Sequence, residues 1–531
     1  MKQNREQYKV NNAIILAAGM SSRFVPISYE SPKSLIVVKG ERLIERQIRQ
    51  LKEAGIDDIT IVVGYLKEQF FYLEEKFGVK IVVNKDYYKY NNTSSLMCVA
   101  DKLANTYICS SDNYFTENVF ESHVEKPFYS AVFANGKTNE YCLTYDKDGL
   151  ITDVHIGGEN KWYMFGHVYF DKSFSEKFVK ILNEEYKKQI TKEELWENMY
   201  MRHIEDLPLY IKKYDDGIIY EFDSLKELRT FDKEVFDKLD SPILNVICKT
   251  LDCSINEIDD IQVLKAGMTN NSFLFSCKNK RYIMRIPGAG TDNIINRKDE
   301  YNNYQVIAGL NISDSIKYIN PNNGYKITEF IDNAKVCDPY NNHDLVLCMR
   351  KLREFHQMKL CVGHEFDLFE RINFYEELRE SKKSFYNDYL DVKYRVFKLR
   401  EYINQNIENI TLTHIDAVPD NFLINKDNVF LIDWEYAGMQ DPHVDVAMFC
   451  IYAGYNKVEI DNLINIYFQN NCAENIRLKI YCYIAVCGLL WSNWCEYKHS
   501  LGIDFGKYAK KQYEYAQKYS EFCIDLIGLE S

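Results

Sequence analysis

The sequence predicts two domains of mixed helix and strand, an α/β domain in residues 1–240 and a second domain in residues 241–531. The chain of 531 residues is longer than one ordinary hydrophobic core requires. Short apolar runs alternate with helical segments in the first half, and Gly55 and Gly78 end two of those segments. This alternation is typical of a parallel sheet covered by helices. Ser241-Pro242 stops a charged helical segment and marks the predicted junction.

The composition fits a globular protein and argues against two classes of function. A net charge of −13 argues against nonspecific binding of nucleic acid, although a nucleotide substrate needs only a few local cations. The most apolar later stretch, residues 480–491, is shorter than the roughly 20 residues of a membrane-spanning helix, so we expect a buried helix and no membrane insertion. The 15 cysteines, without a CxxC pair or a secretion signal, predict reduced thiols in a cytoplasmic protein. The oligomeric state stays open, with a homo-oligomer among the options.

The elements of the first domain follow from its apolar runs. Residues 13–16, 59–63 and 80–83 are short and apolar, which predicts three buried strands. Residues 43–54 and 68–77 have the apolar spacing of helices, and each segment is followed by a glycine. Strands and helices that alternate in this way predict the parallel core of the sheet.

A loop of small residues follows the first strand directly and suggests a phosphate site. It runs from Ala17, Ala18 and Gly19 through two serines to Arg23. Small side chains after a strand let backbone N–H groups approach phosphates closely, and Arg23 can reach the far phosphates of a nucleoside triphosphate. Lys33 follows ten residues after Arg23, where it can neutralise charge beside the reacting phosphorus. An ordinary turn explains the small residues alone, but not their spacing from Arg23 and Lys33.

The strings LAAGMSSRF and PKSL resemble the signature of nucleotidyltransferases that join a sugar phosphate or an alcohol phosphate to a nucleoside triphosphate. GIDDITIVVGY and NKDYYKYNNTSSL make the resemblance closest to bacterial CTP:phosphocholine cytidylyltransferases. Ser21 stands where many relatives have glycine, which leaves the loop geometry and the choice of base open. The resemblance implies a Rossmann-like α/β fold. Residues 107–111 form a fourth short apolar run and predict a strand, and the resemblance makes Asp112 at its end a Mg²⁺ ligand, with an Asp that caps the strand as the alternative. The resemblance also implies a second acid near residues 217–223, where Asp223 fits the metal role and the cap of the next helix equally well.

The same resemblance implies the chemistry of the first domain. A phosphocholine oxygen would attack the α-phosphorus of CTP, and pyrophosphate would leave. No protein nucleophile is required, so positioning and charge neutralisation by Lys33 and Arg23 would do the catalysis. Trp162 can hold the trimethylammonium group by cation–π contact, although packing in the core is the alternative for any aromatic residue. Further candidates of this kind are Tyr163, Trp196 and Tyr200.

The stretch at residues 413–437, THIDAVPDNFLINKDNVFLIDWEYA, carries the strongest chemical signal of the chain. Asp416 and Asn421 lie in a turn-rich loop, and Asp433 ends the apolar run that follows. Transfer of a phosphoryl group to a hydroxyl needs a carboxylate for the hydroxyl proton and oxygen ligands that hold Mg²⁺ against the ATP phosphates. Asp416 fits the first role, and Asn421 and Asp433 fit the second. A hairpin rich in Asp and Asn explains the loop alone, but not the apolar run and Asp-Trp-Glu behind it.

These residues resemble the catalytic segment of the choline/ethanolamine kinase and aminoglycoside phosphotransferase families, and Asp-Trp-Glu-Tyr-Ala is closer to the choline kinase branch. The resemblance implies an α+β protein-kinase-like fold. Three predicted strands, at 261–264, 272–277 and 282–286, match its small lobe. The turn at Gly267–Asn271 would cover the ATP phosphates, although an ordinary hairpin explains that turn as well.

Further site residues of the second domain come from the same resemblance. Arg285 would contact the ATP phosphates, and Glu300 on the next helix would be its ion-pair partner. Glu329 and Ile331 would lie at the hinge, where backbone groups bind adenine. A surface arginine and an unrelated helical glutamate are the alternative for the first pair.

A substrate site is suggested by two tryptophans near the end of the chain. Trp491 and Trp494 lie three residues apart on one face of a predicted helix, where two indoles can wall a site for a quaternary ammonium. Glu435 and Tyr436 can add a charge and a further ring. A buried tryptophan pair is the alternative, and the resemblance to choline kinases, which have such a pair, favours the substrate site.

Together the two resemblances predict a bifunctional enzyme with ATP, CTP, choline and phosphocholine as substrates and Mg²⁺ as cofactor. The second domain would make phosphocholine, and the first would convert it to CDP-choline. The nearest rival hypotheses use ethanolamine, or a sugar phosphate in the first domain and an aminoglycoside in the second. A nucleotide-binding regulator with an inactive kinase half is the rival from another class, and the presence of Asp416, Asn421 and Asp433 argues against it.

Overall fold

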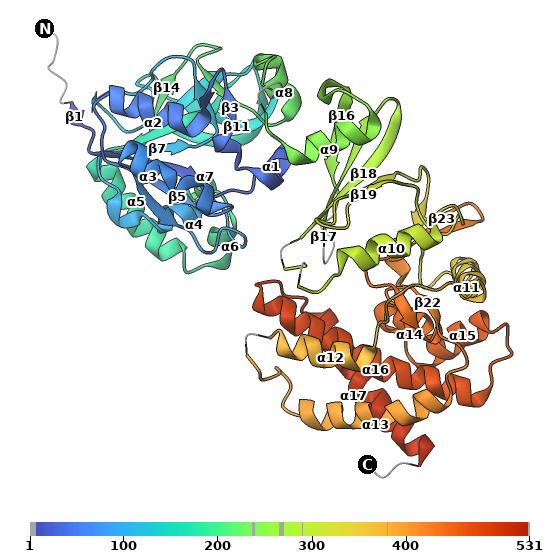
Figure 1. The fold of residues 1–531 in the computed structure, drawn as a ribbon. Helices are drawn as coiled ribbons and strands as arrows, with labels where there is room; N and C mark the ends of the chain where they lie inside the picture. Colours follow the sequence, from blue (N-terminus) through green and yellow to red (C-terminus); the bar gives the residue numbers. More distant parts are fainter. Residues whose placement is uncertain are drawn as a thin grey trace, which may run out of the picture. The chain divides into compact units, whose positions relative to one another are not determined.

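The chain folds, in this computed structural model, as two compact units, Met1–Cys248 and Lys249–Ser531 (Figure 1). The structure describes residues 7–235, 239–264, 270–288, 290–291, 293–379 and 381–528. Each unit is built around its own hydrophobic core. Helix α9 (Pro242–Leu251) contains the point at which the first unit ends and the second begins.

A nine-stranded sheet forms the centre of the first unit. Its parallel part consists of four neighbouring strands in the order β7, β2, β5 and β6. Their bounds are Thr106–Ser110, Asn12–Ala17, Ile59–Val63 and Lys80–Val83. These strands confirm the four apolar runs that the sequence predicted, and their carboxyl ends meet at one edge of the sheet.

The rest of the sheet is antiparallel, so the expectation of a parallel sheet holds only in part. β13 (Trp162–Phe170) pairs antiparallel with β7, and also with β10 (Phe128–Phe133) and β11 (Lys137–Tyr145). β12 (Ile151–Glu159) adds an edge strand beside β11, and β14 (Tyr210–Lys213) lies beside β10. Strands such as β11 and β12 are joined by a short connection without a crossover helix, and such a connection can only join antiparallel neighbours.

Helices cover both faces of this sheet (Figure 1). α2 (Leu43–Glu53) and α3 (Tyr72–Phe77) place their apolar side chains in the cluster that contains Ile15 and Ile61. α5 (Lys172–Glu185) and α7 (Trp196–Arg202) contribute to a second cluster. Trp196 and Tyr200 belong to that second cluster and are fully buried, so packing explains both aromatic residues.

Two short strands outside the main sheet join distant parts of the first unit. β8 (Asn113–Phe115) pairs antiparallel with β15 (Ile219–Glu221), and Asn113 lies opposite Glu221 in that register. β8 begins directly after Asp112, so this pairing brings Glu221 next to Asp112 along the strand pair. The charged helical segment before Ser241-Pro242, which the sequence predicts over residues 225–239, is the shorter helix α8 (Leu225–Phe231).

A buried histidine makes the stability of the first unit depend on pH. The imidazole of His167 is surrounded by aromatic rings, which belong to Tyr107, Phe115, Phe120, Phe128 and Tyr214. Burial, followed by the charge of Lys212, lowers the pKa of His167 to about 3. The native state therefore keeps this imidazole neutral at pH values where an unfolded chain protonates it.

We expect the free energy of unfolding of the first unit to fall by about 2 kcal/mol between about pH 7.5 and about pH 5, because only the unfolded state binds the proton in that range. His167→Phe should remove this dependence, whereas the same change at the exposed His155 should leave it. Urea unfolding of the full chain at both pH values, with proteolytic fragments of the first unit as the signal, measures the difference. An unchanged pH slope in His167→Phe contradicts the assignment.

The second unit begins with a five-stranded antiparallel sheet in the order β16, β17, β18, β20 and β19. The bounds in that order are Ile258–Val263, Asn270–Cys277, Lys280–Pro287, Lys326–Glu329 and Ile316–Ile319. β16, β17 and β18 confirm the three strands predicted at the start of this domain. Most of the predicted phosphate-covering turn, from Gly267 to Thr269, lies outside the described residues.

Helices make up most of the remainder of the second unit (Figure 1). α10 (Arg297–Ile307) follows β18 and lies near the small sheet. The bounds of α11 to α17 are Asn342–Gln357, Leu368–Glu377, Tyr389–Gln405, His443–Ala453, Lys457–Tyr467, Glu474–Ser500 and Lys507–Ile527. α16 is buried along nearly its whole length and contains the predicted apolar helix. Within the described ranges, no helix has the length and apolar character that a membrane crossing requires.

Short strands carry the polar segment that the sequence singled out. β22 (Thr411–Thr413) pairs with β25 (Gly438–Gln440), and β23 (Phe422–Asn425) forms a hairpin with β24 (Asn428–Leu431). Asp416 and Asn421 therefore lie between β22 and β23, and Asp433 follows β24. The predicted strand that ends at a carboxylate is confirmed.

Candidate active sites

A cavity of about 460 Å³ lies at the carboxyl ends of β2 and β7 in the first unit. The loop after β2 lines it with Ala17, Ala18 and Gly19. A side chain added at Gly19 would meet open space, so the backbone of this loop is accessible to a ligand. Lys33 and Asp112 line the same cavity, which brings most of the residues predicted for the triphosphate together.

Lys33 and Asp112 form a buried ion pair in this cavity. Lys33 Nζ lies 2.8 Å from Asp112 Oδ2, and only 5% of the lysine side chain is exposed. The hydroxyl of Ser110 donates a hydrogen bond of 2.9 Å to Asp112 Oδ1. Burial raises the pKa of Asp112, but the charge and the hydrogen bond of Lys33 lower it more, so the pKa lies below its ordinary value. The pair therefore supplies an ionised carboxylate and an ammonium group to one cavity.

The acid coupled to Asp112 is Glu221, not the Asp223 that the sequence favoured. The charge of Asp112, followed by burial, raises the pKa of Glu221 to about 8. Asp223 forms an ion pair with Arg23 instead, at 2.8 Å between Nη1 and Oδ1. Arg23 was expected to reach the triphosphate, but it is 70% exposed and does not line the cavity. The register of β15 on β8 decides this arrangement, and that register has no signal in the local sequence.

Asp112 and Glu221 fit the requirements of a divalent cation. The raised pKa of Glu221 arises mainly from repulsion by Asp112, and a bound cation would relieve that repulsion. Carboxylate oxygens are also the ligands that Mg²⁺ prefers. These two residues would therefore hold the metal ion of the first unit.

Further acids and tyrosines lie close to Glu221. Tyr129 donates a hydrogen bond of 3.0 Å to Glu197, and the charge of Glu221 acts on Tyr129 as well. Burial, followed by the charges of Glu140 and Glu221, raises the pKa of Tyr163 to about 12. Carboxylates and aromatic rings grouped in this way suit a cationic ligand, because both favour positive charge.

Trp162 contributes its ring elsewhere. It precedes Tyr163 on β13, and neighbouring residues of a strand point to opposite faces of the sheet. Its ring packs at 5.4 Å from that of Phe133, and Lys213 Nζ lies 5.1 Å from the ring centre. Because a lysine already lies over this indole, the structure gives no support to Trp162 as the site of a trimethylammonium group.

A cavity of about 340 Å³ in the second unit gathers the polar residues of the 413–437 segment. Asp416, Asn421 and Asp433 all line it, together with Arg285. Asn421 Nδ2 donates hydrogen bonds to Asp416 Oδ2 at 3.1 Å and to the Asp416 carbonyl oxygen at 2.9 Å. The carboxylate, the amide and the second carboxylate therefore face one space, as the proposed chemistry requires.

The loop that carries Asp416 is held by a buried carboxylate. Ile415 has φ of 68°, a backbone region that β-branched residues rarely adopt. The backbone N–H groups of His414 and Ile415 donate to Asp445 at 3.0 and 2.7 Å, and His356 Nε2 lies 2.9 Å from the same carboxylate. His414 Nε2 lies 2.9 Å from the carbonyl oxygen of Ile432, so it orients the loop. Asp445 therefore braces the loop that carries Asp416.

The carboxylate of Asp416 is repelled by the neighbouring acids, although Arg285 lies 3.3 Å from Asp433. Burial, followed by the charges of Asp433 and Glu435, raises the pKa of Asp416 well above its ordinary value. A cation bound by Asn421 and Asp433 would remove that repulsion, and one amide oxygen with one carboxylate is a suitable set of donors for Mg²⁺. These two residues would hold the metal ion of the second unit.

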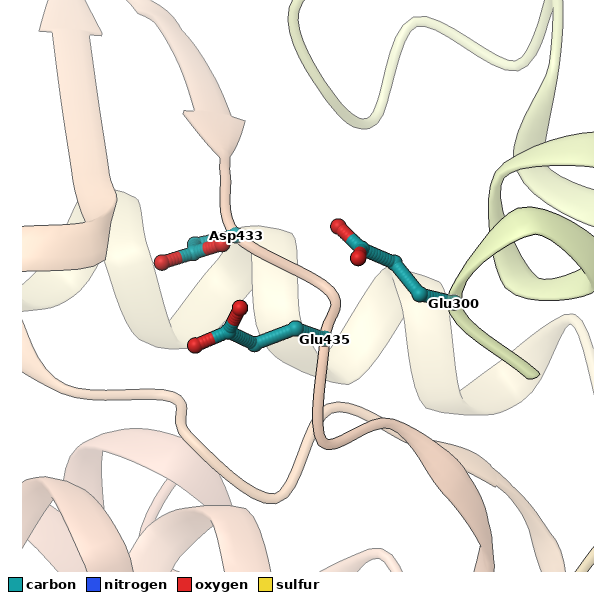
Figure 2. A group of neighbouring side chains, drawn as sticks. All are labelled: Glu300, Asp433 and Glu435. Atoms are coloured by element: carbon teal, nitrogen blue, oxygen red, sulfur yellow. The ribbon is translucent and has the colours of Figure 1, made fainter. Parts of the chain in front are cut away.

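Three carboxylates, those of Glu300, Asp433 and Glu435, lie within 4.8 Å of one another (Figure 2). Glu300 points from α10 toward the segment that carries the other two (Figure 2). Arg285 Nη2 donates to Glu300 at 2.7 Å, which is the predicted ion pair, and Arg285 Nη1 lies 3.3 Å from Asp433. Arg297 Nη1 lies 3.0 Å from Glu300 and 3.1 Å from Glu435. Two arginines therefore balance this group, and Asp433 alone of the three lines the cavity.

Besides Glu300, three predicted residues of the second unit lie outside this cavity. Glu435, expected beside the substrate, is buried and accepts hydrogen bonds from Asn270 at 2.9 Å and from Arg297. Glu329 and Ile331, expected at the adenine, line a neighbouring cavity of about 760 Å³. The side chain at the end of a strand points in a direction that depends on how the small sheet packs against the rest of the second unit. Local sequence does not specify that packing.

Five aromatic rings line the cavity next to the polar residues. Trp491, Trp494 and Tyr436 were predicted, and Tyr452 and Tyr508 join them. The ring centres of Trp491 and Trp494 are 5.6 Å apart, and those of Trp491 and Tyr436 are 5.2 Å apart. Tyr452 comes from α14 and Tyr508 from α17, and neither stands in a motif that distinguishes it from other tyrosines.

Comparisons with known proteins divide the chain at the same place as the fold. Residues 13–138 match the family model of a MobA-like NTP transferase domain, and residues 261–484 match that of choline/ethanolamine kinase. The first half is 38% identical over 221 residues to the choline-phosphate cytidylyltransferase of Streptococcus pneumoniae, which covers 42% of this chain and 96% of that protein.

Two further relatives are similar to one half each. A 2-aminoethylphosphonate cytidylyltransferase of Lancefieldella rimae is 35% identical over 225 residues, which covers 42% of this chain and 92% of that protein. Protein LicA of Haemophilus influenzae is 30% identical over 269 residues of the second half, which covers 48% of this chain and 99% of that protein.

Proposed function

Because the chain belongs to the choline-phosphate cytidylyltransferase branch of the MobA-like NTP transferases in its first half and to the choline/ethanolamine kinase family in its second, we propose that it converts choline to CDP-choline in two consecutive reactions. The second unit transfers the γ-phosphoryl group of ATP to choline, which yields phosphocholine and ADP. The first unit transfers CMP from CTP to phosphocholine, which yields CDP-choline and pyrophosphate. The observation that carries the choice of choline is the aromatic lining beside Asp416, in a kinase whose product the fused first domain would consume.

The residues of the second unit divide the phosphoryl transfer between them. Asp416 orients the choline hydroxyl and accepts its proton as the oxygen attacks the γ-phosphorus. Asn421 and Asp433 would hold Mg²⁺, which neutralises charge on the phosphates when bound. Asp445 keeps the strained loop at Ile415 in place, so the carboxylate of Asp416 is already positioned before choline arrives.

The aromatic lining favours a quaternary ammonium over a primary one. A trimethylammonium group donates no conventional hydrogen bonds, and its positive charge is stabilised by aromatic faces. Trp491, Trp494, Tyr436, Tyr452 and Tyr508 supply rings at the end of the cavity that Asp416 also lines. A primary ammonium such as that of ethanolamine needs hydrogen-bond acceptors, and the indoles of Trp491 and Trp494 supply none.

The first unit needs only to position the phosphate of phosphocholine against the α-phosphorus of CTP and to neutralise charge. The backbone of Ala17, Ala18 and Gly19 would contact the triphosphate, and Lys33 would stabilise the charge that develops around the α-phosphorus. Asp112 and Glu221 would hold Mg²⁺. The positive end of phosphocholine would lie toward Glu140, Glu197 and Tyr129, where carboxylates and a ring coincide.

The direct test supplies the full chain with choline, ATP, CTP and Mg²⁺ and follows the products by phosphorus NMR. We expect CDP-choline, pyrophosphate and ADP, with phosphocholine as the intermediate. Omission of CTP should stop the reaction at phosphocholine, and supply of phosphocholine should make ATP unnecessary. ATP hydrolysis that does not depend on any acceptor, or no turnover with any acceptor, contradicts the proposal.

A second candidate function deserves a matched assay because one relative of the first half acts on 2-aminoethylphosphonate. That compound carries its phosphorus on carbon, so no kinase is needed to prepare it. A fused kinase therefore favours a phosphate ester as the acceptor of the first unit. Parallel assays with phosphocholine, phosphoethanolamine and 2-aminoethylphosphonate decide between them, and the highest kcat/KM is expected for phosphocholine.

Trp491→Ala should raise the KM for choline by about 3- to 30-fold, because one wall of a cation–π site is worth about 0.5–2 kcal/mol. The KM for ATP should stay within about twofold of the wild-type value. Trp491→Phe keeps a ring and should lose less affinity for choline than the alanine variant. Steady-state kinetics of the kinase reaction measures all three values, and equal effects on choline and ATP would mean that Trp491 only supports the fold.

A further inference from the structure

Two cations line the cavity of the second unit within the described part of the chain, Arg285 and Lys326. They lie directly opposite each other on neighbouring strands, because β18 and β20 pair antiparallel with Arg285 opposite Lys326. Side chains that are directly opposite in such a pair lie on the same face of the sheet. Both cations are buried, with 5% and 7% of their side chains exposed. The resemblance placed Arg285 at the ATP phosphates, and Lys326 stands in none of the predicted motifs.

Arg285 is already surrounded by protein acceptors. Its Nη2 donates to Glu300 at 2.7 Å and to the carbonyl oxygen of Gly324 at 3.1 Å. Its Nη1 lies 3.3 Å from Asp433 and 3.4 Å from Glu435. The guanidinium therefore joins the three carboxylates of Figure 2 into one network.

Lys326 is held more loosely. Its ammonium donates one hydrogen bond, of 2.6 Å, to the hydroxyl of Tyr304. The carboxylates of Glu300 and Asp433 lie 3.7 and 3.9 Å away, which is beyond hydrogen-bond distance. An ammonium has three donors, and among the residues whose positions are described only Tyr304 accepts one of them. A buried charged donor without an acceptor is unfavourable, so the remaining donors indicate a ligand with anionic oxygens.

We propose that Lys326 binds the phosphate chain of ATP, with its Nζ donating hydrogen bonds to nonbridging phosphate oxygens. This inference rests on the proposed ATP-dependent function of the second unit. Asp433, 3.9 Å from Lys326, is the carboxylate assigned to the metal ion that accompanies those phosphates. The ammonium of a lysine acts on phosphate as a compact point charge. The hydrogen bond to Tyr304 holds the ammonium of Lys326 in position. Arg285 then serves mainly to hold Glu300, Asp433 and Glu435 in their arrangement.

The test compares the binding of ADP and adenosine to the full chain by calorimetry in the presence of Mg²⁺. Both proteins in the comparison carry Lys33→Met, which disables the triphosphate cavity of the first unit. Lys326→Met should weaken ADP binding by about 10- to 100-fold, the usual effect of losing hydrogen bonds from a charged donor. Adenosine has no phosphate, so its affinity should stay within about twofold. Lys280→Met, on the exposed side of the same sheet, is the matched control and should change neither value.

A loss of ADP affinity smaller than fivefold overturns the proposal, and so does an equal loss for adenosine in a variant that keeps its thermal midpoint. Lys326→Gln retains a polar head for Tyr304 and repeats the comparison where the methionine variant does not fold. The measurement needs no acceptor. A failure of choline phosphorylation in the wild-type chain would therefore reject the proposed substrate while leaving the ADP comparison intact.

Discussion

Asp416→Asn should reduce choline-dependent formation of ADP by about 10³-fold, because the amide cannot accept the proton of the attacking hydroxyl. The same protein should still make CDP-choline from supplied phosphocholine and CTP at the wild-type rate. Asn keeps the size of the side chain and can retain a polar contact with Asn421, which donates to Asp416 at 3.1 Å. Coupled measurement of ADP release and of CDP-choline formation on one preparation separates the two activities.

Stability distinguishes a catalytic loss in Asp416→Asn from a folding defect. Burial and the charge of Asp433 raise the pKa of Asp416, so the ionised carboxylate destabilises the native state when no metal ion is bound. The neutral amide removes that repulsion, and the thermal midpoint of the variant in metal-free buffer should equal or exceed the wild-type value. A lower midpoint together with the loss of both activities contradicts the role given to Asp416.

Lys33→Met should reduce CDP-choline formation by about 10²- to 10³-fold, which is the usual effect of removing one preorganised charge from a transition state. Lys33 is the buried cation of the first cavity, and its partner Asp112 would be left beside Glu221 without compensation. Phosphorylation of choline should continue, so phosphocholine should accumulate when choline, ATP and CTP are all present. Lys39→Met, at an exposed lysine close in sequence that does not line the cavity, is the matched control.

A mixture of the two variants tests the division of labour directly. Asp416→Asn retains the first unit and Lys33→Met retains the second, so the mixture should make CDP-choline from choline while neither variant does so alone. Phosphocholine released by one chain is small and diffuses to the other. A mixture that stalls at phosphocholine would mean that Asp416→Asn also damages the first unit, which contradicts the proposed division of labour.

Local sequence predicted the main elements of both folds well. The four parallel strands of the first unit and the first three strands of the second follow from short apolar runs, because burial on both faces requires such runs. The first unit matches the family model of a MobA-like NTP transferase domain, and the second belongs to the choline/ethanolamine kinase family, as the motifs indicated. The antiparallel part of the first sheet was missed, although β10 and β13 are largely apolar, because their pairing joins residues far apart in the chain.

Lys33, Asp112, Asp416, Asn421 and Asp433 stand in motifs with local spacing, and these motifs were enough to predict the kind of chemistry. The partner of each residue depends on contacts that form only when the chain folds. The register of β15 on β8 coupled Glu221 to Asp112 and left Asp223 with Arg23. Pairing of β18 with β20 placed Lys326 beside Arg285, and α17 brought Tyr508 to the aromatic rings. These contacts join residues far apart in the chain, and their energies depend on burial and distance, which no local pattern of residues records.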